Sequence, residues 1–80
     1  MEKQKFNKRF GKFVAQKRLE LNLTQSELAA KIGNNPQNIS RLERGEVSPT
    51  LYWTGQLAKA FDLSLSEFVA ELEDFNNTGA

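Results

Sequence analysis

The chain has 80 residues with no cysteine and no histidine, and it carries a formal net charge of +1 at pH 7. A chain of this length forms one small domain around a single core, and without cysteine or histidine it has no disulfide, thiolate metal site or histidine base. No apolar run is long enough to cross a bilayer and no signal-peptide core is present, so we expect a cytoplasmic protein without cofactor or metal.

The N-terminal third of the chain carries the spacing of two helices. Apolar residues predict a first helix over about Lys5–Leu21, and they form one stripe made of Phe6, Phe10, Phe13, Val14 and Leu21. Thr24 and Glu27 form a capping box, which satisfies two free backbone N–H groups at a helix start. The second helix therefore begins at Thr24 and ends at Gly33. Its inward face carries Leu28, Ala29 and Ile32.

The middle of the chain predicts two more helices. An asparagine N-cap followed by Pro36 at the first helical position opens a third helix, which covers about Asn35–Arg44. Either Ser48 or Thr50 can cap a fourth helix. The apolar residues of that fourth helix are Leu51, Leu57, Ala58 and Phe61.

A second capping box, Ser64 with Glu67, opens the fifth helix. Its apolar positions have the spacing i, i+3, i+4 and i+7, at Leu65, Phe68, Val69 and Leu72. No segment alternates apolar and polar residues long enough to predict a strand. The sequence therefore predicts an all-α bundle of five short helices, with one domain over residues 1–75 and a disordered tail over 76–80.

The second and third helices form a tight crossed pair. Ala29 is small where the third helix crosses the second, and Gly33 permits the positive φ that a short turn between crossed helices requires. Ile39 and Leu42 anchor the third helix to the core from one side.

The opposite side of the third helix is polar. At about 100° per residue, it carries Gln37, Ser40, Arg41 and Arg44. An ordinary solvated helix surface would have the same appearance. However, Gln pairs with adenine and Arg with guanine in the major groove of DNA, so the face also suits the reading of bases.

The charge of the chain is unevenly distributed. Residues 1–44 carry ten Lys or Arg against four acidic residues, a net charge of +6, whereas residues 45–80 carry one against six, a net charge of −5. Taken alone, this is either a lopsided solvated surface or a positive face for a polyanion. The basic half contains the crossed helix pair.

The segment LTQSELAAKIGNNPQNISRLERG, Leu23–Gly45, resembles the helix-turn-helix of the phage Cro and repressor family, also called the xenobiotic-response-element family. Pro49–Phe68 is similar to the fourth and fifth helices of that family, so the resemblance covers roughly residues 10–70. It implies a lambda-repressor-like helix-turn-helix domain that binds double-stranded DNA, with Asn35–Arg44 as its recognition helix.

The resemblance also implies roles for individual side chains. The residues at base-reading positions are Gln37, Asn38, Ser40 and Arg41. The residues expected to contact the DNA backbone are Thr24, Gln25, Asn35 and Arg44. Arg18 and Glu43 match an ion pair that ties the first helix to the end of the third. We expect that pair to position the helices rather than to add stability.

The sequence departs from the family pattern at several positions. Pro36 replaces a glutamine that often reads a base, so one contact is missing. Thr54 and Gly55 occupy positions that are usually apolar or good helix formers, and Gly55 costs up to about 1 kcal/mol relative to alanine. Tyr52 and Trp53 could belong to the core, a dimer contact or a phosphate contact, with burial favoured for Trp53.

One recognition helix reads only a few base pairs, and members of this family usually bind as twofold dimers on half-sites roughly 34 Å apart. We therefore expect a homodimer formed by the region after the third helix. Candidate contacts on the fifth helix are Val69, Leu72 and Phe75, although the first two could equally belong to the core.

The leading functional hypothesis is a sequence-specific transcriptional regulator that represses its promoter. The alternatives are an antitoxin with a toxin protein as partner, or a restriction-modification controller. An enzyme is disfavoured because no nucleophile has a base beside it and no phosphate-binding glycine loop is present.

Overall fold

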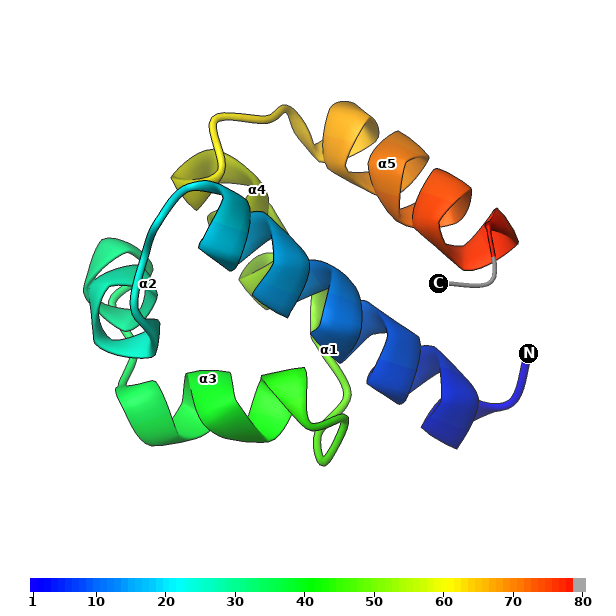
Figure 1. The fold of residues 1–80 in the computed structure, drawn as a ribbon, viewed down its shortest axis with the longest axis horizontal. Helices are drawn as coiled ribbons and strands as arrows, with labels where there is room; N and C mark the ends of the chain where they lie inside the picture. Colours follow the sequence, from blue (N-terminus) through cyan, green and yellow to red (C-terminus); the bar gives the residue numbers. More distant parts are fainter. Residues whose placement is uncertain (79–80) are drawn as a thin grey trace.

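In the computed structural model, which describes residues 1–78, the chain forms five α-helices and no strand within that range (Figure 1). The helices are α1 (Lys3–Glu20), α2 (Gln25–Lys31), α3 (Pro36–Glu43), α4 (Leu51–Ala60) and α5 (Leu65–Asn77). The predicted all-α, five-helix fold is confirmed. Within the described part of the chain, no helix has both the length and the apolar character needed to span a bilayer.

The central helix of the fold is α1, which packs against both α3 and α5. Phe10 and Phe13 of α1 are buried and meet Phe68 of α5. The ring centroid of Phe68 lies 5.9 Å from that of Phe10 and 5.2 Å from that of Phe13. The other buried apolar residues are Val14, Leu28, Ala29, Ile39, Leu42, Leu57, Ala58, Phe61 and Leu72. This core fixes α1 between α3 on one side and α5 on the other.

Both predicted capping boxes are present. At the start of α2, the Glu27 backbone N–H donates to the Thr24 hydroxyl at 3.0 Å and the Glu27 carboxylate accepts from the Thr24 N–H at 2.8 Å. Ser64 and Glu67 repeat the arrangement at α5, with distances of 3.1 and 2.8 Å. The backbone N–H of Ser64 holds the pKa of Glu67 below its usual value. Each box satisfies two N–H groups that a helix start leaves free.

Of the two residues that could cap α4, Ser48 and Thr50, the structure has Thr50 at the N-cap. Its hydroxyl accepts the Trp53 backbone N–H at 3.0 Å. Ser48 instead accepts a hydrogen bond from the Asn7 side-chain amide at 2.9 Å. Asn7 is the one buried polar residue among those described, so this bond ties the α3–α4 loop to α1.

The first four helices end in the same way. The residue that leaves each helix has a positive φ: 57° at Asn22, 66° at Gly33, 76° at Gly45 and 63° at Asp62. In each case the next backbone N–H bonds to the carbonyl five positions earlier, at 2.9 to 3.0 Å. This is the Schellman arrangement, which favours glycine because a Cβ is strained at positive φ. Gly33 was predicted in this role, whereas the two non-glycine residues were not.

We expect Asp62→Gly to stabilise the fold. The exposed Asp62 has a φ of 63° and lies at the C-terminal end of α4, where a negative charge opposes the helix dipole. Glycine relieves both effects, so the urea midpoint should rise by the equivalent of roughly 0.5–1 kcal/mol. The matched control, Asp74→Gly inside α5, replaces one poor helix former by a poorer one and should lose roughly 0.3 kcal/mol. A lower midpoint for Asp62→Gly would contradict this explanation of the helix end.

The end of α5 differs from the prediction of a tail that begins at residue 76. Asn76 and Asn77 form the last turn of α5. The Arg9 guanidinium holds that turn, since it donates to the carbonyl of Asn76 at 3.0 Å and to its side-chain oxygen at 3.3 Å. This tertiary contact was not visible in the local sequence. Residues 79–80 of the expected tail lie outside the described residues.

Two of the three residues expected at a dimer interface belong to the fold of one chain. Leu72 is only 7% exposed and is part of the core. Phe75 packs on Phe13, with ring centroids 5.6 Å apart, and the Arg9 guanidinium lies 5.8 Å from the Phe75 ring centroid. Val69 alone remains 41% exposed. Of the two alternatives left open for Leu72, the structure supports the core, because Leu72 lies on the buried side of α5.

Candidate nucleic-acid interface

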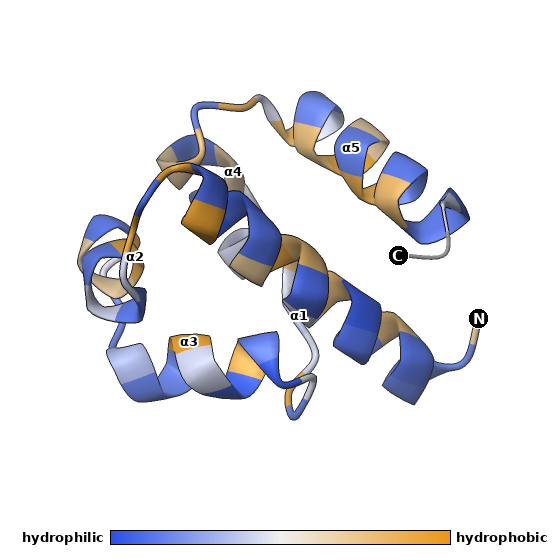
Figure 2. Ribbon diagram, in the orientation of Figure 1, coloured by the Kyte–Doolittle hydropathy of each residue, from blue (hydrophilic) through white to orange (hydrophobic). Residues whose placement is uncertain are grey.

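The helix α3 forms one edge of the molecule, on the side of α1 opposite to α5 (Figure 1). Ile39 and Leu42 are at most 1% exposed and anchor α3 in the core, whereas Gln37 and Arg41 are exposed. Figure 2 shows the hydrophobic residues of α3 on the side that faces α1 and hydrophilic residues on the outer side. The polar outer side of α3 is therefore accessible to another molecule.

Asn38 and Ser40 are less accessible than Gln37 and Arg41. Both are half-buried. The Asn38 amide donates to the Asn34 side-chain oxygen at 2.7 Å, and the Ser40 hydroxyl accepts a hydrogen bond from the Arg44 guanidinium. Among the expected base-reading residues, Gln37 and Arg41 therefore offer side chains that no hydrogen bond ties to the rest of residues 1–78.

A partly buried ion pair fixes the end of α3. Arg18 of α1 donates to both carboxylate oxygens of Glu43, at 2.7 and 3.2 Å, and a third bond reaches the Leu23 carbonyl at 2.7 Å. Gln25 at the start of α2 donates to the same carboxylate at 3.0 Å. The side chains of Arg18 and Glu43 are 12% and 8% exposed. This network holds the first three helices in one geometry, which is a positioning role.

The residues expected to contact the DNA backbone are mostly engaged within the fold. The Thr24 hydroxyl caps α2, and the Asn35 side-chain oxygen caps α3 by accepting the Asn38 N–H at 2.9 Å. The Gln25 amide donates to Glu43. Arg44 is the one charged residue among these four.

Arg44 has an acidic neighbour that sequence reasoning did not assign. The Glu46 carboxylate accepts from the Arg44 guanidinium at 2.7 and 3.2 Å, and both side chains are about half exposed. The bond raises the pKa of Arg44 and lowers that of Glu46. Glu46 thus occupies the hydrogen-bonding edge of Arg44 that a phosphate would use. The spacing of two residues across Gly45 was the available signal.

The contact of α1 with the end of α3 was expected from the Arg18–Glu43 pair, but the two close backbone approaches there were not predicted. A Cβ placed on Gly11 would lie 2.4 Å from the Leu42 carbonyl oxygen and 2.5 Å from that of Glu43. A Cβ on Gly45 would lie 2.7 to 3.0 Å from Lys8. The backbones of α1 and α3 therefore touch at two glycines. A glycine in the middle of a predicted helix was the signal that could have indicated this contact.

The structure places the four residues at the start of α4 whose roles the sequence left open. Trp53 is half-buried against the core, as favoured, and its indole nitrogen is buried without a partner among the described residues. The Thr54 hydroxyl donates to the Thr50 carbonyl at 2.8 Å, so its polar group is satisfied within the helix. A Cβ on Gly55 would meet nothing within 4 Å, so this glycine faces open space. Tyr52 is 77% exposed.

An apolar groove runs beside these α4 residues. We call it the α4–α5 groove, and its apolar lining consists of Leu51, Tyr52, Gly55, Ala58, Leu63 and Leu65. Leu51 is 75% exposed. Exposed apolar side chains that gather in this way usually mark a surface that another molecule covers.

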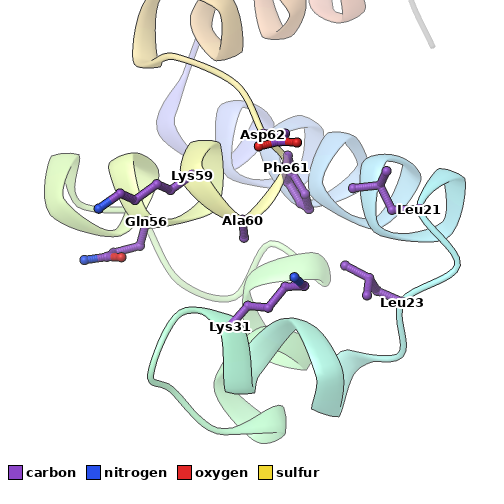
Figure 3. Close-up of a pocket in the computed structure, with 8 residues that line it drawn as sticks. All are labelled: Leu21, Leu23, Lys31, Gln56, Lys59, Ala60, Phe61 and Asp62. Carbon is purple, nitrogen blue, oxygen red and sulfur yellow. The ribbon is translucent and has the colours of Figure 1, made fainter.

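A second pocket lies between the end of α1, α2 and α4, and Figure 3 shows the side chains that line it. Leu21 and Leu23 form one wall, and Lys31 extends into the space from α2. None of the expected DNA-contacting residues lines this pocket. Lys31 therefore provides a positive charge that is separate from the outer side of α3.

Comparison with known proteins supplies the family. A family model described as helix-turn-helix matches residues 14–68, which is more than half of the chain. The chain belongs to the helix-turn-helix family of transcriptional regulators. This confirms the resemblance to Cro and repressor proteins, and the family is one of regulators rather than enzymes.

Individual helix-turn-helix proteins agree with this assignment. An uncharacterized HTH-type transcriptional regulator, y4dJ of Sinorhizobium fredii, is 38% identical over 64 residues, which cover 80% of this chain and 83% of that protein. The restriction-modification controller protein C.AhdI from Aeromonas hydrophila has a TM-score of 0.71 at 28% identity, with 76% of this chain and 92% of that chain covered. The clp gene regulator ClgR from Corynebacterium glutamicum has the same fold, with a TM-score of 0.78 at 20% identity and coverage of 92% and 80%.

Proposed function

We propose that this helix-turn-helix protein binds a specific double-stranded DNA operator as a homodimer and represses transcription by occupying its promoter. It does so in the cytoplasm, at the nucleoid. The observation that carries the proposal is the outer side of α3, where Gln37 and Arg41 are exposed above a buried anchor of Ile39 and Leu42. Glutamine suits adenine and arginine suits guanine in the major groove, and each good pair contributes roughly 1–3 kcal/mol of discrimination.

The dimer is formed through the α4–α5 groove. One α3 reaches only a few base pairs, so a specific operator requires a second copy. The groove supports this assignment because Leu51 and Tyr52 are three-quarters exposed and Gly55 leaves room for the close approach of another helix. Val69 lies exposed on the same half of the chain, and it is the one residue of the expected interface set that the core does not use.

We expect Tyr52→Glu to yield a monomer. A carboxylate in an apolar contact loses its hydration, so the dimer is destabilised while the monomer, in which Tyr52 is exposed, keeps its fold. Sedimentation at micromolar concentration measures the result, and affinity for the operator should fall with it. The matched control is Leu19→Glu, since Leu19 is 61% exposed on α1 and does not line the groove. A wild-type protein that stays monomeric both alone and on operator DNA would contradict the homodimer.

The second candidate function is control of a restriction-modification system. The similarity to C.AhdI, which covers 92% of that controller, favours it over a toxin partner. The same DNA-binding surface serves either role, so the bound site distinguishes them. An operator upstream of a paired methyltransferase and endonuclease would favour the controller, whereas a second polypeptide that co-purifies with the chain would favour the antitoxin.

We expect Glu46→Gln to strengthen binding to all double-stranded DNA, by roughly two- to tenfold at moderate salt. The Glu46 carboxylate competes with a phosphate for Arg44, and removing its charge frees the guanidinium. Fluorescence anisotropy on one specific and one random duplex measures the change. Glu73→Gln removes the same charge from an exposed site on α5 and is the control. The gain should disappear when Glu46→Gln is combined with Arg44→Ala. An unchanged affinity would show that Glu46 does not compete with a phosphate for Arg44.

A further inference from the structure

We propose that Lys8 and Lys12 of α1 form a second phosphate-binding site, which contacts the DNA backbone beside the bases that α3 reads. The inference rests on the proposed function and extends the same interface. It adds a DNA contact from α1, the helix in which only Arg18 has so far been given a role, that of positioning α3. Its ligand is the phosphodiester backbone of double-stranded DNA, independent of base sequence.

The charges of this site are uncompensated within the fold. No acidic residue occurs between Glu2 and Glu20. The basic residues that follow Lys12 in α1 are engaged, since Lys17 pairs with Glu71 and Arg18 with Glu43. Lys8 and Lys12 are exposed, and neither forms a salt bridge with any of residues 1–78.

The spacing of the two lysines concentrates their charge. Positions i and i+4 lie on one side of a helix, so the two ammonium groups face the same way and repel each other. A bound anion relieves that repulsion. Neighbouring phosphates on a DNA strand offer a row of such anions, and counterion release makes each contact favourable.

The position of Lys8 relative to α3 is fixed by backbone contact. A Cβ on Gly45, the residue directly after α3, would lie 2.8 Å from the Lys8 Cα and 2.7 Å from its Cγ. One turn further along α1, Gly11 meets the last carbonyls of α3. Asn7, next to Lys8, donates a hydrogen bond to Ser48 and so ties α1 to the α3–α4 loop as well. The lysine pair therefore cannot move independently of the recognition helix.

The direction of α1 brings the part of the helix that carries Lys8 and Lys12 to the edge of the molecule at which α3 lies. In Figure 1 the N-terminal turns of α1 extend past the C-terminal end of α3 and reach the same edge of the molecule as α3. When α3 lies in the major groove, that edge faces the strand that borders the groove. Lysine suits this role because its ammonium is a flexible point charge that binds phosphate without reading a base.

The experiment uses the full chain and three test variants: Lys8→Gln, Lys12→Gln and the double variant that carries both substitutions. The control is Lys31→Gln. Lys31 has the same charge but extends into the pocket between α2 and α4 (Figure 3). Binding to a specific and a random duplex is measured over a range of salt concentrations. Each α1 substitution should make the slope of log K against log salt shallower by roughly 0.9 and weaken binding roughly fivefold to tenfold at 0.1 M salt on both duplexes. Lys31→Gln should leave the slope unchanged.

Ethylation interference on the specific duplex gives the location. Phosphates beside the bases read by α3 should be sensitive with wild-type protein and lose that sensitivity with the double variant. Equal slopes for Lys8→Gln, Lys12→Gln and Lys31→Gln would overturn the site, because the effect would then be one of net charge alone. If wild-type protein fails to bind double-stranded DNA, the proposed function itself fails. If it binds and the α1 variants bind equally well, only the lysine site fails.

Discussion

Gly11→Ala should destabilise the protein by about 3 kcal/mol and lower its melting temperature by roughly 12–24 °C. Gly11 lies in the middle of α1, where alanine normally gains about 1 kcal/mol of helix propensity. Here the added methyl group would lie 2.4 Å from one carbonyl oxygen of α3 and 2.5 Å from another. Both atoms are backbone, so α1 and α3 must separate and the core contacts of Ile39 and Leu42 loosen.

The control for this clash is Gly55→Ala, the same substitution in a helix where the new methyl group meets nothing within 4 Å. It should gain up to about 1 kcal/mol, measured at concentrations low enough that unfolding does not depend on dimer formation. Urea and thermal unfolding of both variants provide the comparison. Equal stabilities for the two variants would mean that α1 and α3 do not cross at Gly11.

Arg41→Ala should weaken binding to the specific operator by about 1–3 kcal/mol and relax the preference at one base position. Arg41 is exposed on the outer side of α3 and forms no salt bridge with any of the described residues. Its loss therefore removes the proposed contact to DNA without leaving a buried partner. Binding to random duplexes should change much less.

Arg44→Ala is the matched comparison, because it removes the same charge three residues later, at the C-cap of α3. Arg44 is paired with Glu46 and is expected to contact a phosphate, so its loss should weaken binding to every sequence and reduce the salt slope by about one unit. Titrations of both variants on specific and random DNA separate the two roles. If Arg41→Ala loses affinity equally on both DNAs, Arg41 binds the backbone and the base-reading assignment is wrong.

The helices and their starts followed from the sequence because the signals are local. Thr24 with Glu27 and Ser64 with Glu67 cap the helices that follow them, and these boxes depend on residues three positions apart. The apolar spacing also gave most of the core. The sequence left Leu72 open between core and interface, because a stripe of apolar residues does not show which part of it a neighbouring helix covers.

The features that escaped prediction depend on contacts between distant parts of the chain. Gly11 and Gly45 are explained by the contact of α1 with the end of α3; a glycine within a helix signals a close approach but does not identify which backbone lies against it. The last turn of α5 is held by Arg9, which is more than sixty residues away in sequence. Asn22 and Asp62 end helices with positive φ, a role in which local rules favour glycine.

The candidate site shows the same division. Periodicity alone placed Gln37 and Arg41 on the outer side of α3, and the structure has both exposed there. The Arg18–Glu43 ion pair came from the family resemblance and is present at 2.7 Å. The partner of Arg44 was not anticipated: Glu46 is close in sequence, but proximity alone does not show that two exposed side chains adopt the rotamers that pair them.

The most direct test of DNA reading by α3 is selection of bound duplexes from a random pool by the wild-type protein. We expect an enriched motif made of two inverted half-sites whose centres lie about one helical turn apart, as two α3 helices related by a twofold axis require. With Arg41→Ala, the same selection should lose its preference at one position in each half-site. A pool that shows no enrichment after several rounds at low ionic strength would contradict the assignment of α3 as a recognition helix.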